Sequence, residues 1–154
     1  MEYNEKLNIA DMVRCAENFT KTLTHALKVE ANDPKLVNTG ENVEESDYSF
    51  EYQLVRSAVI HVFETTVESA WKMMQRWVKI NVDKSIAQKP KRELFRTAHD
   101  SGLIADAEEW WKFFDARNKT SHTYHEEVAE EVYAIAKQFN EPLKDFIKRL
   151  EERR

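Results

Sequence analysis

Eight consecutive residues of this 154-residue chain combine side chains that are suited to chemistry on phosphate: Arg117-Asn118-Lys119-Thr120-Ser121-His122-Thr123-Tyr124. Arginine carries a permanent charge in a planar fork that binds phosphate oxygens. Histidine exchanges protons near neutral pH, so His122 could take a proton from a ribose 2′-hydroxyl or give one to a leaving oxygen. Arg117 could stabilise charge that develops on the phosphate. The octet could therefore act on a phosphodiester without a metal ion.

The spacing of these side chains requires a break between two helices. On one unbroken helix Arg117 and His122 would point about 140° apart. Thr123, followed three residues later by a glutamate, resembles a capping box, which predicts a new helix with Tyr124 at its first position. A turn can then aim both side chains at one spot, with Asn118 orienting the histidine or holding the turn. The residues alone leave a plain alternative open, in which Arg117 pairs with an acid, His122 is a turn residue and Tyr124 is core.

The composition limits the class of protein. Only two glycines and three prolines occur, which favours long helices, and 42% hydrophobic and 33% charged residues fit a globular protein. A net charge of −5 argues against a surface that coats nucleic acid nonspecifically. The single cysteine, Cys15, excludes an intrachain disulfide, no signal peptide is recognisable, and no apolar run approaches ~18 residues. We therefore expect a cytoplasmic, all-α protein with one domain over residues 1–154.

Apolar periodicity predicts an antiparallel up-and-down bundle of four to six helices. A first helix is expected over about 5–30 and a long second one over about 49–82, with an acidic linker at 31–47 between them. The expected buried stripe of the first helix is Met12, Ala16, Phe19, Leu23 and Leu27. That of the second is Phe50, Leu54, Ala58, Val62, Phe63, Val67, Ala70, Trp71, Met74 and Val78. The second helix is long for a compact domain, so it either kinks or is partly covered by a second subunit.

Helix-start and helix-stop signals place the later helices. Pro90 suits the first turn of a third helix that Gly102 ends. Asp106, followed three residues later by Glu109, resembles a capping box that opens a fourth helix. A fifth helix starts at the octet, and Pro142 opens a short last one.

Several side chains outside the octet could support it. The only basic concentration lies at 83–96, and it is either a solvated loop and helix start or a contact for RNA or nucleotide phosphate. The phosphate-binding candidates are Lys91, Arg92, Arg96 and Lys119. Glu64 and Glu68, four apart on the long helix, either meet an Arg or Lys of a neighbouring helix or place Glu64 beside the octet. His122 and His125 are too few ligands for a zinc site, so no metal is expected. The four tryptophans are expected in the core or an interface, with base stacking as an alternative for the one nearest the octet.

The pattern Arg-Asn-x-x-x-His-x-Tyr resembles the signature of the HEPN superfamily of small helical nucleotide-associated proteins. Further matches resemble one branch of it, the nucleotidyltransferase substrate-binding protein family. They are Phe63-Glu64, Glu68-Ser69-Ala70-Trp71-Lys72, Arg96-x-Ala98, Gly102-Leu103-Ile104 and Trp110. The resemblance covers about residues 49–139.

This resemblance implies a homodimer that forms a complex with a separate minimal nucleotidyltransferase. In related toxin–antitoxin pairs the HEPN partner is a metal-independent ribonuclease, and arginine and histidine from both protomers line one cleft. The nucleotidyltransferase silences it by adding AMP to the motif tyrosine, here Tyr124. Arg117, Asn118 and His122 are then the expected catalytic residues, and Glu64 and Ser121 are expected to support them.

Three functions therefore stay open: a binding subunit for a nucleotidyltransferase, a ribonuclease, and a helical scaffold in which the octet is structural. No cofactor is expected. With two glycines the chain has no phosphate-cradling loop of its own, so a partner must perform any nucleotidyl transfer.

Overall fold

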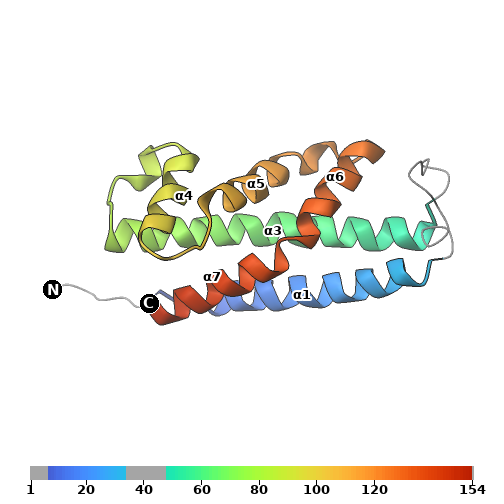
Figure 1. Ribbon diagram of the computed structural model, residues 1–154, viewed down its shortest axis with the longest axis horizontal. Helices are drawn as coiled ribbons and strands as arrows, with labels where there is room; N and C mark the ends of the chain where they lie inside the picture. Colours follow the sequence, from blue (N-terminus) through green and yellow to red (C-terminus); the bar gives the residue numbers. More distant parts are fainter. Residues whose placement is uncertain (1–6, 34–47, 154) are drawn as a thin grey trace.

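The long helix α3 (Phe50–Asn81) forms the spine of the computed structural model, which describes residues 7–33 and 48–153 (Figure 1). Its 32 residues give it a length of about 48 Å. Ser49 caps its first turn, because the Ser49 side chain accepts a hydrogen bond from the backbone N–H of Tyr52. The bounds agree with the predicted helix over 49–82.

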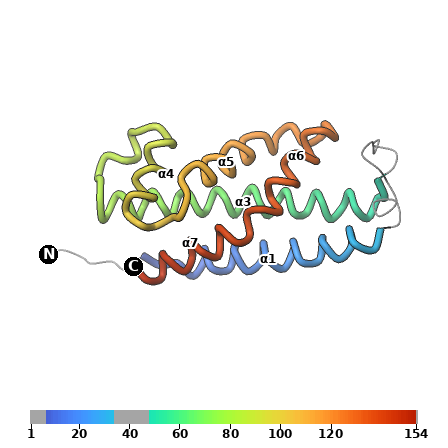
Figure 2. The backbone as a smooth tube through the Cα atoms, in the orientation of Figure 1, coloured from blue at the N-terminus to red at the C-terminus, as the bar shows by residue number. Residues whose placement is uncertain are grey.

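Five further α-helices pack around α3, and the described residues contain no strand. α1 (Ala10–Ala31) runs antiparallel along one side of α3 (Figure 2). The 3₁₀ turn η2 (Ile86–Gln88), α4 (Lys91–Asp100) and α5 (Ala107–Asn118) follow on another side of the spine. α6 (Glu126–Lys137) crosses α3 obliquely, and α7 (Asn140–Arg153) then lies beside α1. The predicted all-α up-and-down bundle is confirmed.

The first helix begins later than predicted, at Ala10 rather than near residue 5. The Asn8 side chain accepts a hydrogen bond from the Ala10 N–H, which favours a turn ahead of the helix. The buried stripe is right except at its end, where Ala26 is buried and Leu27 is 44% exposed. Of the predicted acidic linker, Ala31 belongs to α1 and Asp33 is buried, and 34–47 lie outside the described residues.

The predicted stripe of α3 is wrong over its first two turns. Phe50 is 76% exposed and Leu54 is 54% exposed, and Ala58 is exposed as well. The buried positions there include Tyr52 and the charged Arg56. A charged residue does not count towards an apolar stripe, so periodicity placed the buried face on the wrong side of this part of the helix.

The starts of the third and fourth helices follow their predicted signals. Pro90 is the residue before α4, and Gly102 follows its end with a φ of +78°, a conformation that glycine adopts without strain. The Asp106 carboxylate accepts hydrogen bonds from the N–H groups of Glu108 and Glu109 and so caps α5. In the last helix, α7, Leu143, Phe146 and Leu150 are buried and Ile147 is half-buried.

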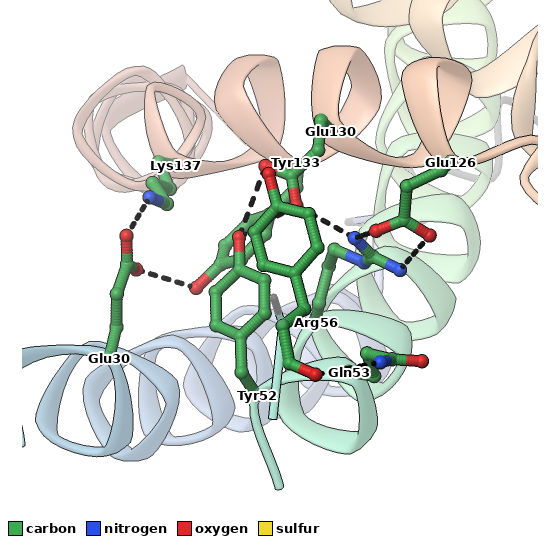
Figure 3. Close-up of polar contacts among 9 residues, drawn as sticks. Glu30, Tyr52, Gln53, Arg56, Glu126, Glu130, Tyr133 and Lys137 are labelled. Atoms are coloured by element: carbon green, nitrogen blue, oxygen red, sulfur yellow. Dashed lines mark hydrogen bonds and ion pairs between the residues drawn. The ribbon is translucent and has the colours of Figure 1, made fainter. Parts of the chain in front are cut away.

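A buried polar network joins α3 to α6 (Figure 3). Arg56 is 5% exposed, and its guanidinium binds the carboxylates of Glu126 and Glu130. The Tyr52 hydroxyl donates to Glu130 at 2.9 Å, and burial, followed by that hydrogen bond, raises the pKa of Tyr52. Close by, Glu30 of α1 accepts hydrogen bonds from Tyr133 and Lys137 of α6 at 3.0 and 2.8 Å. Three helices are thus held together by charges at one end of the bundle.

Replacing Arg56 by methionine is expected to destabilise the protein by about 3 kcal/mol, because Glu126 and Glu130 would lose the cation that compensates their partial burial. Urea unfolding followed by circular dichroism measures the loss. Arg14→Gln is the matched control, since Arg14 pairs with Asp11 at the exposed surface and should cost under about 0.5 kcal/mol. Equal stabilities of the two variants would contradict the anchoring role of Arg56.

Candidate phosphate-chemistry site at the α5–α6 junction

The octet lies where α5 ends and α6 has not yet begun. Arg117 is in the last turn of α5, and the short 3₁₀ helix η3 (Thr120–His122) follows. η3 packs against α3, α5 and α6, so three helices fix the position of this turn. The predicted break between two helices at the octet is therefore confirmed.

The predicted capping box at Thr123 is wrong. Thr123 instead donates its hydroxyl to the Thr120 carbonyl at 2.9 Å, and Thr120 donates to the Arg117 carbonyl at 2.7 Å. The helix α6 begins at Glu126 with His125 before it, and the Glu126 carboxylate is bound to Arg56 instead of reaching back to Thr123. Tyr124 consequently lies two residues ahead of the helix. Sequence reasoning missed this because the partner of Glu126 comes from a helix 70 residues away.

Arg117 is held by the two glutamates of α3 that the sequence singled out. Its Nε lies 3.1 Å from Glu68 Oε2, and one of its terminal nitrogens lies 3.9 Å from Glu64 Oε1. The prediction that this pair meets a cation of a neighbouring helix is confirmed. The Arg117 Nε is buried, but its contact with Glu68 is an ion pair without the alignment of a hydrogen bond. About a third of the Arg117 side chain stays exposed, so part of the cation remains accessible to an anion.

Glu68 contacts both Arg117 and side chains outside the octet. Besides Arg117, it accepts a hydrogen bond from the Trp71 indole N–H at 3.1 Å and pairs with Lys72 at 3.1 Å. Burial opposes the charge of Glu68, but the contacts from Lys72, Trp71 and Arg117 outweigh it and lower the pKa of this carboxyl. Glu68 is therefore an ionised carboxylate that holds two cations and an indole at neutral pH. The sequence singles out Glu68 as one of a pair and within the match over 68–72, and its link to Trp71 follows from their i, i+3 spacing.

The remaining polar residues of the octet are exposed. Within the described residues the His122 side chain forms no hydrogen bond or ion pair, and its ring approaches that of Tyr124 edge-on, with centroids 6.4 Å apart. Tyr124 is 75% exposed, which contradicts a place in the core, and its ring lies against that of His125 at 4.2 Å. Asn118 and Ser121 are exposed, and the threonines, not Asn118, hold the turn. The His122 and Tyr124 side chains are thus presented to solvent.

The four phosphate-binding candidates fall into two groups. Lys119 pairs with Glu131 at 2.9 Å and Asp115 at 3.7 Å, and Arg96 pairs with Glu93 at 3.1 Å. By contrast, Lys91 and Arg92 pair with no carboxylate of the described chain, and each lies over a tryptophan ring. Two of the four candidates therefore carry charge that no carboxylate neutralises.

In the described ranges no group of three or more His, Cys, Asp or Glu side chains is arranged to hold a metal ion. An apolar hollow of about 410 Å³ lies between α1 and α7, and the octet contributes nothing to its walls. Its lining residues are Val13, Ala16, Glu17, Thr20, Lys21, Lys144 and Ile147. No helix of the described residues is long and apolar enough to cross a membrane.

Residues 14–152 match the family model described as nucleotidyltransferase substrate binding protein like. The chain belongs to this family. It is 40% identical over 81 residues to the probable ribonuclease HepT of Haemophilus influenzae, an alignment that covers 51% of this chain and 55% of that protein. The chain thus matches about half the length of that relative.

The fold is similar to a solved structure from Haemophilus influenzae, described as revealing the fold of a substrate-binding domain of a nucleotidyltransferase. The TM-score is 0.74 at 26% identity, over 94% of this chain and 99% of the other. The family and the fold together establish a nucleotidyltransferase substrate-binding domain. The predicted resemblance is confirmed.

The Glu68 site makes a prediction for the pH dependence of stability. Because the folded-state pKa of Glu68 lies below its unfolded value of about 4.3, its contribution is present above that pH and is lost as the pH falls further. Glu68→Gln should cost up to about 1 kcal/mol at pH 7, since the ion pair is partly exposed, and progressively less as the pH falls below about 4.3. Urea unfolding at a series of pH values measures this. Glu64→Gln, whose contact with Arg117 is 3.9 Å, is the control and should change stability less. A constant cost of Glu68→Gln across the series would contradict the assignment.

Proposed function

We propose that this chain is the HEPN-type partner subunit of a separate minimal nucleotidyltransferase and that it binds nucleotide or RNA around Arg117, His122 and Tyr124. The observation that carries the proposal is one short turn that presents the histidine and the tyrosine to solvent beside an arginine held by α3. The family match over residues 14–152 supports treating residues 1–154 as one domain. A plain scaffold would have no need to expose this combination of side chains.

The activity that these side chains support best is cleavage of RNA without a metal ion, and the name of the HepT relative favours it. In this reaction the ribose 2′-oxygen bonds to phosphorus and the bond from phosphorus to the 5′-oxygen breaks. The products are a 2′,3′-cyclic phosphate and a free 5′-hydroxyl. His122 would take the proton of the 2′-hydroxyl or give one to the leaving 5′-oxygen. Arg117 would stabilise the extra negative charge on the phosphate oxygens.

Two such proton transfers are needed for each cleavage, whereas each chain offers one His122. We propose that a second copy supplies the other, in a homodimer. The exposed Leu54 supports this arrangement, because it lies fourteen residues, close to four helical turns, before Glu68 on α3. The exposed apolar part of α3 is therefore on the same side as the glutamate that holds Arg117. A second copy that covers Phe50 and Leu54 would bring its own octet towards this face.

Cleavage of a labelled RNA in EDTA tests the nuclease proposal. Arg117→Ala and His122→Ala should each lower the rate at least about 100-fold, since each removes a group that acts in the transition state. Asn118→Ala and Ser121→Ala test the two other octet residues that are expected to act in, or support, the cleavage. His125→Ala is the matched control, because this histidine neighbours the octet and lies outside the motif.

Cleavage that survives both substitutions would overturn this choice of site. If the folded native chain cuts no RNA, the nuclease proposal is wrong and the proposed role as a binding subunit remains. That role has its own test, co-purification with a nucleotidyltransferase encoded beside the chain.

Tyr124 is the proposed acceptor of AMP. Its phenol oxygen would attack the α-phosphorus of ATP held by the nucleotidyltransferase, with release of pyrophosphate and loss of the phenol proton. A side chain that is 75% exposed on a short turn is accessible to a second protein. The added phosphate would also place a negative charge beside Arg117 and His122 and so compete with RNA.

Incubation with the partner nucleotidyltransferase and ATP should add mass in steps of one adenylyl group, and Tyr124→Phe should abolish the addition. Intact-protein mass spectrometry measures this. Ser121→Ala is the control, since it removes an exposed hydroxyl from the same turn. Adenylylation of the Tyr124→Phe variant would show that another residue is the acceptor.

A further inference from the structure

Two consecutive cations at the start of α4 each cover a tryptophan from a different helix. Lys91 Nζ lies 4.0 Å from the centroid of the Trp71 ring on α3. The Arg92 guanidinium lies 4.4 Å from the centroid of the Trp111 ring on α5. Both tryptophans are half-buried, so each keeps ring surface near solvent. Cations at these distances are held by the electron-rich face of the ring.

The two tryptophans belong to one continuous aromatic cluster that reaches into the core. Phe114 contacts Trp71 at 6.3 Å and Trp111 at 5.5 Å between ring centroids. Phe95 contacts both Phe114 and Trp111, at 5.8 and 6.4 Å. The rings are packed largely edge to face, which fixes their orientation. The half-buried Trp71 and Trp111 are therefore the outer rings of a fixed cluster that includes the buried Phe95, and the two cations lie on these outer rings.

Lys91 and Arg92 differ in charge pairing from the other two phosphate-binding candidates. Lys119 and Arg96 are paired with carboxylates, whereas Lys91 and Arg92 form no ion pair in the described structure and each lies over a ring. A cation–π contact leaves the charge of the cation intact and open to an anion. Phosphate would therefore bind these two side chains without first displacing a carboxylate.

The patch formed by these two cations and the tryptophans that they cover is continuous with the proposed reaction site through one carboxylate. Glu68 accepts the Trp71 indole N–H at 3.1 Å, and the same Oε2 lies 3.1 Å from Arg117 Nε. Lys72 forms an ion pair with the other carboxylate oxygen of Glu68, and its Nζ lies 5.8 Å from the centroid of the Trp71 ring. Trp71 is thus one side chain away from the arginine that would contact the scissile phosphate.

We propose that Lys91, Arg92, Trp71 and Trp111 form an entry track for single-stranded RNA that leads to Arg117. The phosphates would lie against Lys91 and Arg92, and bases would stack on the exposed parts of the indole rings. Stacking needs an open base face, which single strands offer and duplexes do not. This inference rests on the proposed function and names its substrate as unpaired RNA.

Binding of a fluorescein-labelled single-stranded RNA of about 12 nucleotides tests the track. Anisotropy is measured at several salt concentrations on the His122→Ala background, where the RNA stays intact. Lys91→Gln/Arg92→Gln should weaken binding about tenfold and flatten the slope of log K against log salt by about 1.4, or about 0.7 for each lost phosphate contact. Lys21→Gln/Lys148→Gln is the matched control with the same charge change, on α1 and α7, and it should leave RNA binding nearly unchanged.

Tryptophan fluorescence gives an independent readout of stacking. Single-stranded RNA should quench it, and Trp71→Phe/Trp111→Phe, which keeps aromatic packing, should lose most of the quenching and weaken binding. The track would be overturned if Lys91→Gln/Arg92→Gln and Lys21→Gln/Lys148→Gln weakened RNA binding equally. It would also be overturned if a duplex of the same length bound with equal affinity. Loss of nucleotidyltransferase binding in Lys91→Gln/Arg92→Gln with RNA binding intact would overturn it too, since the patch would then be a protein contact. Track-dependent binding without any cleavage by the native chain would sink the nuclease proposal and leave the track standing.

Discussion

The placement of the octet depends on one buried charge, the guanidinium of Arg56. A buried cation costs several kcal/mol of desolvation unless carboxylates surround it, and here both carboxylates come from the first two turns of α6. A shift of α6 by one residue would turn Glu126 and Glu130 away and leave Arg56 uncompensated. The point where α6 begins is therefore fixed, and with it the short chain from Tyr124 back to Arg117.

The long helix α3 positions the site because its different sides contact different parts of the structure. The buried side packs the core and includes Phe63, Val67 and Met74. Another side, at Glu64 and Glu68, holds Arg117 from α5. Trp71 then links this second side to the cations of α4. A single rigid element thus sets the relative positions of groups that are far apart in the sequence.

Local signals predicted the helices well, and long-range pairs decided what the signals missed. Asp106 caps one helix and Gly102 ends another through neighbours within a few residues, so sequence alone located them. The start of α6 and the buried face of early α3 both depend on Arg56, whose partners are 70 and 74 residues away. The octet itself was visible as residue types, but the exposure of Tyr124 was not.

The acids around Arg117 orient this side chain without blocking it. Its contacts to Glu64 and Glu68 are partly exposed, and such ion pairs contribute roughly 0–1 kcal/mol. A phosphodiester offers two non-bridging oxygens, which share one negative charge and match the arginine fork, so it can exchange with these weak contacts. In the absence of substrate, Glu68 keeps Arg117 beside Trp71 and close to where the strand would arrive. The arginine is therefore preorganised by interactions weak enough to be replaced, which is the property that a binding site for a charged, transient substrate requires.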